Sequence, residues 1–262
     1  MQLKKLIVGV LVALGVTACT TTNEITGRQQ LLLFGADQDA SLGLNAMNQV
    51  KQTAPVVTTG RQATRINRIG QRIAAVSDKP EFDWEFVLIN EDTLNAWALP
   101  GGKVAVYAKM ANALTDLELA AVLGHEVAHA VLRHGAESMS RQSVQQGIMA
   151  GVTIAASTQI ENRQTAGLAV ALANMAAQGF VALPHSRFME LEADDVGTIY
   201  MARAGYDPRA AVSLWQKMAR LKEGGGAPPT FLSTHPSDGK RIARIQEKMP
   251  TYLAEYQKAT QR

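Results

Sequence analysis

Two histidines lie four residues apart in the segment His125-Glu126-Val127-Ala128-His129. On an α-helix, which turns by about 100° per residue, this spacing brings both imidazoles to one side, where they can bind one metal ion. Glu126 lies beside them and can act as a general base toward a water molecule whose pKa a bound zinc ion lowers to roughly 7. The segment therefore predicts a zinc-dependent hydrolase with His125 and His129 as ligands and Glu126 as the catalytic base.

A helix that begins at Thr115 is expected to carry these residues. Thr115 and Glu118 have the spacing of a capping box, in which each satisfies a free backbone amide of the first turn. The apolar run continues to Leu132, and Gly135 is predicted to end the helix in a left-handed conformation. So short a histidine pattern can also arise by chance in a core helix, but the well-capped helix favours the catalytic interpretation.

A catalytic zinc site usually has three protein ligands, so a third must come from outside this pair. His134 is near in sequence, but the extended zinc signature requires glycine where Leu132 stands and histidine where Gly135 stands. On a continuous helix His134 also lies about 140° from His129, and we interpret it as a partner of the helix C-terminus.

The acidic segment 186–197 is the alternative source of the third ligand. Glu190 and Asp194 share one helix face at spacing i, i+4, whereas Glu192 points the other way and needs only solvent. A charged surface helix is the competing interpretation of this segment. Because the histidine pair lacks a ligand, we favour Glu190 as the ligand, with Asp194 as a second acid beside it.

The N-terminus has the three-part layout of a secretory signal over residues 1–18, with two lysines, a short apolar run and small residues at its end. The apolar run is too short to span a bilayer. Cys19 follows and is the single cysteine of the chain, so it cannot form an internal disulfide. We predict that Cys19 carries a lipid and that residues 19–36 form the tether and N-terminal segment; a free surface thiol is the alternative.

The composition of the 262 residues is that of an ordinary globular protein. Removal of residues 1–18 would take away Lys4 and Lys5 and lower the formal net charge from +3 to +1. No run of like charges stands out, so we expect no nucleic-acid partner.

One mainly helical α+β domain with a small sheet is predicted over residues 37–262. Residues 82–89 alternate as in a strand, and residues 95–107 form two short strands around a Pro-Gly-Gly turn. Helices besides the one from Thr115 are expected at 37–52, 61–76, 186–204, 208–222 and 237–248, with a loop at 224–229.

Residues 143–183 are rich in alanine, glycine and methionine and predict a helical hairpin. Gln159, Asn174 and Gln178 interrupt its apolar stretches, which argues against a transmembrane span. We expect these helices to be buried or to lie against a membrane.

Several segments together resemble the HtpX and CAAX prenyl protease family of gluzincin metallopeptidases, in its periplasmic lipoprotein branch with LoiP and BepA. They are residues 23–29, 95–102, 186–194 and 233–236, with the helix that bears His125. The resemblance implies a gluzincin-type zinc peptidase domain, one Zn²⁺ per chain, and a metalloendopeptidase activity.

By this resemblance Glu190 is the third zinc ligand and Asp194 an additional catalytic acid that donates a proton. His235 corresponds to a histidine that can occupy the fourth zinc position and hold the enzyme inactive; a histidine that only packs beside the last helix is the alternative. A substrate-binding edge strand is implied at Asn95, Ala96, Trp97, Ala98, Leu99, Pro100, Gly101 and Gly102.

The implied function is the degradation of misfolded or unassembled cell-envelope proteins, with envelope assembly machinery or other envelope proteases as further partners. Thr20 after Cys19 implies, by the sorting rule of such lipoproteins, a lipid anchor in the outer membrane facing the periplasm. No tetratricopeptide-repeat domain is expected after Arg262, which favours a minimal protease over the assembly role of BepA. The rival hypothesis is a chaperone-like or scaffold lipoprotein with a silent metal site, although such a protein would be expected to lose Glu126.

Overall fold

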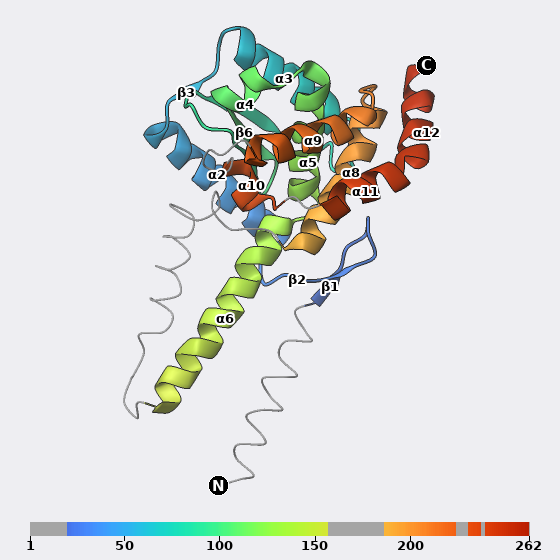
Figure 1. Cartoon of the computed structure of the whole chain (residues 1–262). Helices are drawn as coiled ribbons and strands as arrows, with labels where there is room; N and C mark the ends of the chain where they lie inside the picture. Colours follow the sequence, from blue (N-terminus) through green and yellow to red (C-terminus); the bar gives the residue numbers. More distant parts are fainter. Residues whose placement is uncertain (1–19, 157–185, 224–229, 237–238, 262) are drawn as a thin grey trace.

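A four-stranded sheet lies between helices in the computed structural model, which describes residues 20–156, 186–223, 230–236 and 239–261 (Figure 1). Its strand order is β3-β4-β6-β5, and only β4 and β6 are parallel. Gly101 and Gly102 adopt φ values of 73° and 88°, which glycine allows, and so make the tight turn between β5 and β6. The strands are β3 Val56–Val57, β4 Glu85–Ile89, β5 Ala96–Leu99 and β6 Lys103–Tyr107.

The sheet has two apolar faces because successive side chains along a strand point to opposite sides. One face packs against α3 (Arg61–Ala74) and α5 (Asp116–Val131), and the other against α2 (Ala36–Thr53). The first face buries Phe86, Leu88, Ala96, Val104 and Val106; the second buries Val87, Ile89, Trp97, Leu99 and Ala105.

α5 lies in the middle of the molecule, between the sheet and a set of C-terminal helices (Figure 1). Its main helical neighbour is α8 (Arg187–Arg203), and α9 (Arg209–Glu223) also packs against it. The remaining helices of the described residues are α4 Ala108–Ala113, α6 His134–Ala156, α10 Thr230–Thr234, α11 Gly239–Glu247 and α12 Met249–Thr260.

α5 and α8 cross at a pair of glycines. A Cβ atom added to Gly124 would lie 2.6 Å from the carbonyl oxygen of Gly197, and one added to Gly197 would lie 2.6 Å from the backbone of Gly124. No larger residue fits at this crossing without moving the helices. The two backbones can therefore come close enough for side chains of one turn of α8 to reach those of α5.

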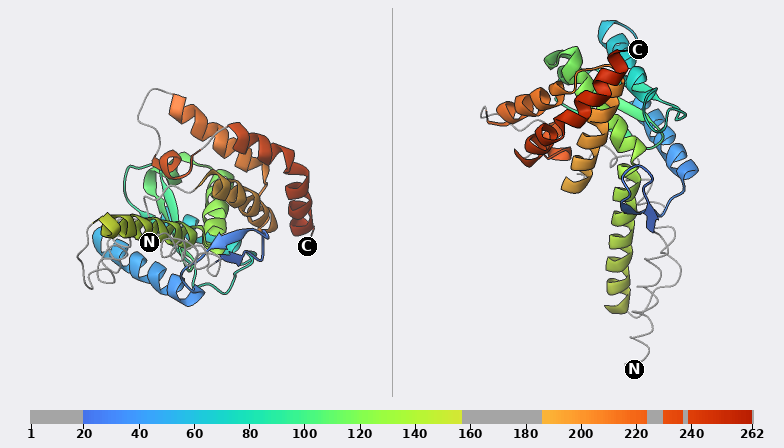
Figure 2. Two further views of the ribbon diagram at one scale, coloured as in Figure 1. Left: turned by 90° about the horizontal axis from the view of Figure 1, so that it is seen from below. Right: turned by 90° about the vertical axis from the view of Figure 1, so that its right-hand side faces the viewer.

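Residues 20–31 form a two-stranded antiparallel ribbon, with β1 at Thr20–Thr22 and β2 at Gln29–Leu31. We call these residues the N-terminal ribbon. It packs against α6 (His134–Ala156), which projects from the body of the molecule (Figures 1 and 2). Polar side chains of the ribbon make tertiary contacts: Arg28 bonds to Glu192, and Gln30 bonds to the carbonyl of Leu132.

The predicted strands and most predicted helices are confirmed within a few residues, including α2, α3, α5, α8, α9 and α11. α4, α10 and α12 were not predicted. The predicted hairpin at 143–183 is described only as far as Ala156, where α6 ends after beginning earlier than expected, at His134. Residues 1–18, Cys19, 157–185 and the loop at 224–229 lie outside the described residues.

In the part of the chain that the structure describes, no helix is both long and apolar enough to cross a membrane.

Candidate metal centre

α5 brings together the three residues of the histidine segment. The helix begins as predicted: the Thr115 hydroxyl accepts from the Glu118 amide (3.3 Å), and the Glu118 carboxylate accepts from the Thr115 amide (2.9 Å). His125, Glu126 and His129 are all buried, and the Nε2 atoms of the two histidines lie 3.0 Å apart. Both imidazoles thus point to one spot.

α8 supplies a carboxylate to the same spot. Ser186 caps this helix, since its side chain accepts from the Met189 amide. Glu190 follows in the first turn and is fully buried, with its two oxygens 3.3 Å from His125 Nε2 and 3.3 Å from His129 Nε2. The structure therefore brings together the three residues that the sequence proposed as ligands.

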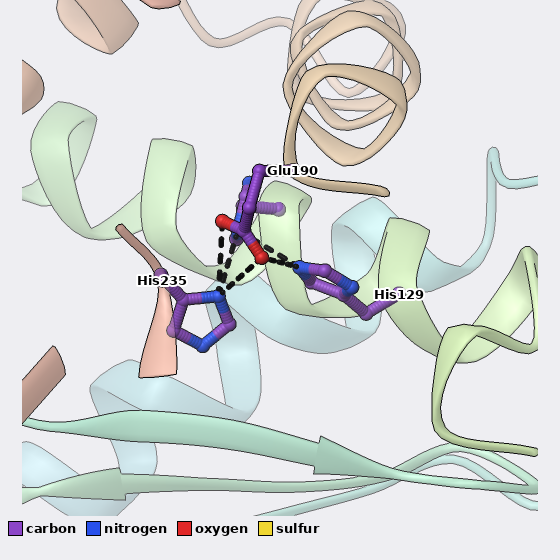
Figure 3. A group of neighbouring side chains, drawn as sticks. His129, Glu190 and His235 are labelled. Atoms are coloured by element: carbon purple, nitrogen blue, oxygen red, sulfur yellow. Dashed lines mark hydrogen bonds and ion pairs between the residues drawn. The ribbon is translucent and has the colours of Figure 1, made fainter. Parts of the chain in front are cut away.

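His235 closes the cluster from the segment after α10 (Figure 3). Its Nδ1 lies 3.2 Å from His125 Nε2 and 3.2 Å from a Glu190 oxygen, while its Nε2 lies 3.4 Å from Glu126 Oε1. The His235 amide donates to the Phe231 carbonyl at 2.8 Å, which ties the ring to the end of α10.

The donor set and its spacing fit a zinc ion. His125, His129, Glu190 and His235 each offer one ligand atom, and these four atoms lie within 4.8 Å of one another. With metal–nitrogen bonds of about 2.0–2.1 Å, two ligand atoms of a tetrahedral site are roughly 3.3–3.4 Å apart. The neighbouring donor atoms in the cluster are 3.0–3.3 Å apart. Imidazoles and a carboxylate are also ligand types that zinc takes in proteins.

The electrostatics of the cluster favour a cation among these side chains. Burial alone would raise the pKa of Glu190, but the positive charges of His235, Arg241 and His129 hold it well below its usual value. Burial would lower the pKa of His125, yet hydrogen bonds and charges of Asp194 and Glu190 raise it to about 9. The carboxylates of Asp194 and Glu190 therefore attract positive charge to the His125 imidazole.

Glu126 is in a different environment from Glu190. Burial raises its pKa, although His235 and His125 oppose this shift. Its Oε1 atom accepts no hydrogen bond within the described residues. A buried carboxylate oxygen without a hydrogen bond, next to the ligand cluster, is suited to bind a water molecule or a substrate group.

Asp194 lies behind His125. Its Oδ1 is 3.0 Å from His125 Nδ1, and its two oxygens accept from Arg241 Nε at 2.6 Å and from a second Arg241 nitrogen at 2.7 Å. Burial would raise the pKa of Asp194, but the attraction of Arg241 lowers it. An ionised carboxylate in this position orients the imidazole that it contacts.

Arg241 is a component of the site that the sequence analysis missed. It is buried, lies 2.8 Å from Glu190 as well as contacting Asp194, and stacks over the Trp215 ring at 3.6 Å. Nothing in the sequence distinguishes it from its basic neighbours Lys240 and Arg244, because only the tertiary fold buries one of the three.

The predictions for His134 and Glu192 are wrong. α5 ends before Arg133, whose positive φ of 58° turns the chain and places His134 beneath the cluster, with its Nδ1 2.9 Å from His129 Nδ1. Gly135 is not the cap, since it lies inside α6. Glu192 is buried, with an oxygen 3.2 Å from His134 Nε2, and is not a solvated acid.

Arg133 can adopt this conformation because other contacts hold it. A left-handed non-glycine residue costs roughly 1–2 kcal/mol. The Arg133 guanidinium is bonded to Asp39 of α2 at 2.7 Å and to the carbonyl of Phe34 at 2.8 Å. These partners lie about a hundred residues earlier in the chain, so a local pattern could not reveal them.

β5 lies at the edge of the sheet, next to the cluster. It pairs only with β6 in the described sheet, and the carbonyl of Leu94, just before it, accepts from the Phe231 amide of α10 at 2.9 Å. The Asn95 carbonyl accepts from the Tyr107 amide. By the alternation of an antiparallel ladder, the backbone groups of Ala96 and Ala98 then point away from β6.

Comparison with known proteins gives a family match over residues 60–249, to peptidase family M48. The mitochondrial metalloendopeptidase OMA1 of Schizosaccharomyces pombe is 38% identical over 186 residues, which is 71% of this chain and 52% of that protein. Human OMA1 is 30% identical over 240 residues (87% and 46%), and the beta-barrel assembly-enhancing protease of Yersinia pestis is 30% identical over 218 residues (81% and 44%). The chain thus spans about half the length of these relatives.

Proposed function

Because the chain belongs to peptidase family M48, we propose that it is a zinc-dependent endopeptidase that degrades misfolded or unassembled cell-envelope proteins. The observation that supports the enzymatic part most directly is the buried ligand cluster beside Glu126. The placement in the envelope rests on the signal-like residues 1–18 with Cys19, and on relatives named beta-barrel assembly-enhancing protease.

His125, His129 and Glu190 hold the metal in this proposal, and His235 occupies the fourth position in the resting state. Bound zinc supplies a Lewis acid that polarises the peptide carbonyl and makes water more acidic. Glu126 accepts a proton from the attacking water and passes it to the leaving amine. The resemblance assigns Asp194 the role of a proton donor; because Arg241 bonds to both of its oxygens, we propose instead that Asp194 acts through His125.

An extended polypeptide would bind by adding a strand to β5. The outward backbone groups of Ala96 and Ala98 offer it main-chain hydrogen bonds, which depend little on the substrate's sequence. Folded proteins rarely present a free extended segment of this kind, whereas misfolded or unassembled ones do. This favours unfolded polypeptides as the substrate class.

The location is proposed to be the outer membrane, through a lipid on Cys19, with the domain facing the periplasm. Relatives named mitochondrial OMA1 are also similar to this chain, so similarity alone does not select the compartment. The lone cysteine directly after a signal-like segment favours the bacterial envelope.

The test is hydrolysis of casein by the purified full-length protein with zinc, with a chelator, and with Glu126→Gln. We expect zinc-dependent cleavage that the chelator abolishes, and a loss of about 10²–10⁴-fold in kcat for Glu126→Gln, which is the size of a general-base contribution. Glu126→Gln should still bind zinc. Glu247→Gln, the same change at an exposed position of α11, serves as the control.

The rival function is a chaperone-like or scaffold protein with a silent metal site. It predicts that the zinc-loaded wild type binds unfolded casein without cleaving it. That result, with the fold and the zinc content intact, would refute the endopeptidase proposal.

A further inference from the structure

Two of the clustered histidines are supported from behind by different groups. His125 Nδ1 faces Asp194, a carboxylate of α8. His129 Nδ1 instead faces His134 at 2.9 Å, and His134 Nε2 in turn faces Glu192 at 3.2 Å. Glu192 lies two residues from Glu190 and two from Asp194 on the same helix, so α8 supports both rings but by different routes.

The geometry points to a positioning relay: we propose that His134 and Glu192 hold the His129 imidazole in its metal-binding orientation, with Arg28 of the N-terminal ribbon fixing Glu192. The proposal rests on the proposed function only in requiring that this cluster binds a metal. It adds residues that touch neither the metal nor the substrate.

Each hydrogen bond of the relay can be assigned a donor and an acceptor, running from His129 through His134 to Glu192. A histidine that binds a metal through Nε2 carries its proton on Nδ1, so His129 Nδ1–H donates to His134 Nδ1. The proton of His134 is then on Nε2, where it donates to Glu192 Oε2. Glu192 Oε2 also accepts from Arg28 Nε at 2.7 Å. No group in the relay has to donate and accept at the same atom.

Burial makes the relay stiff. His134 is fully buried and Glu192 nearly so. In such surroundings a hydrogen bond is not exchanged for water, so it fixes the orientation of His129.

The N-terminal ribbon forms the far end of the relay. Arg28 bonds to both oxygens of Glu137 on α6, at 2.9 and 2.6 Å, in addition to Glu192 on α8. Gln30 donates to the carbonyl of Leu132, where α5 ends, at 2.8 Å. The ribbon thus joins the ends of α5, α6 and α8 directly behind His129. It precedes residues 60–249, over which the family match extends.

Two substitutions of His134 each remove one of its two contacts, either the one with Glu192 or the one with His129. In His134→Asn the side-chain oxygen can stand where Nδ1 stood and still accept from His129, although the contact with Glu192 is lost. In His134→Gln the polar atoms reach the position of Nε2, so the contact with Glu192 survives and the acceptor for His129 is lost. A purely structural role of His134 predicts no such order between the two variants.

The experiment is a competition titration of Zn²⁺ between a chelator of known affinity and the full-length protein. We expect zinc affinity to fall about 10–100-fold in His134→Gln, the usual effect of removing the hydrogen-bond partner of a metal ligand, and less than about 10-fold in His134→Asn. Glu192→Leu should behave like His134→Asn, with a measurable loss of less than about 10-fold, because it removes the contact with Glu192 and leaves the acceptor for His129. The double variant His134→Gln/Glu192→Leu should be no weaker than His134→Gln alone, because the two residues act through one contact.

Thermal unfolding without zinc serves as the measure of the fold. Glu118→Gln, which removes the charge of a buried capping carboxylate on α5, should lower the unfolding midpoint and leave zinc affinity unchanged. Wild-type affinity in both His134→Gln and Glu192→Leu, or additive losses in the double variant, would overturn the relay. Absence of zinc binding by the wild type would instead overturn the metal site itself. If His134→Gln does not fold, the Glu192→Leu result decides.

Discussion

Three carboxylates within five residues of α8 have three different environments. Glu190 faces the ligand cluster, Asp194 is paired with Arg241, and Glu192 is bonded to Arg28 and His134. All three are carboxylates, so the direction in which each side chain points from α8, and hence the partners that it meets, determines its role.

Glu190→Gln and Glu192→Gln are expected to differ in zinc retention. Glu190→Gln replaces a charged ligand by a weak neutral one, so most of the zinc should be lost on dialysis against a modest chelator concentration. Glu192→Gln should keep its zinc, because the amide oxygen still accepts from His134. Metal content after dialysis measures both. Equal retention would show that Glu190 is not a ligand.

His235→Ala tests the fourth position. The His235 ring lies where it would exclude water from the cluster and face Glu126. We expect the variant to cleave casein severalfold faster than the wild type and to cleave itself sooner, with zinc still held by His125, His129 and Glu190. Initial rates and gel analysis of stored protein measure this. Unchanged or lower activity in a folded, zinc-loaded variant would exclude inhibition by His235.

The sequence could reveal those site residues that lie at helical spacing from one another within a single helix. His125 with His129, and Glu190 with Asp194, are pairs at i, i+4 on single helices, so the helix geometry alone aligns them. Arg241 and His134 could not be found in this way. The first depends on packing between α11 and α8, and the second on a bend that Asp39 stabilises through Arg133.

Among the elements, β5 and β6 lie where the sequence predicted two strands. The Pro-Gly-Gly turn and the alternation around it predicted two strands, and the structure adds that, within the described residues, β5 pairs with a strand on one side only. Elements without such a pattern were missed. α12, for example, lacks a strong apolar stripe and buries Tyr252 as its single buried residue.

Ala98→Pro tests whether β5 pairs with the substrate. The Ala98 N–H points away from β6, so proline removes it without breaking the ladder within the sheet. The loss of one main-chain hydrogen bond should raise KM for casein up to about tenfold, with little change in zinc content. Ala98→Ser keeps the N–H and is the matched control. The same KM in both variants would mean that the substrate binds elsewhere.

At the scale of the whole molecule, the N-terminal ribbon determines how far the catalytic domain can lie from its proposed lipid anchor. Residues 20–31 begin directly after Cys19, and Arg28 ties them to α6 and α8 through ion pairs with Glu137 and Glu192. Any lipid on Cys19 would therefore hold the catalytic domain close to the membrane surface, without a long flexible linker between them.

Cys19→Ala should release the protein from membranes while zinc content and casein hydrolysis stay within about twofold of the wild type, as is usual for changes far from a site. Fractionation of cell envelopes, followed by assay of the soluble fraction, measures this. Tight membrane association of Cys19→Ala would assign the anchor to another part of the chain, with residues 143–183 the first to be deleted.

The close crossing of α5 and α8 bears on how genuine sites of this type can be recognised among chance matches. Gly124 stands directly before the first histidine, and Gly197 stands seven residues after Glu190, so both occupy fixed offsets from the ligands. A chain with the His-Glu-x-x-His pattern but a bulky residue at either offset could not bring its carboxylate within reach in this geometry. Requiring a small residue at both offsets would therefore reject many accidental occurrences of the pattern in other proteins.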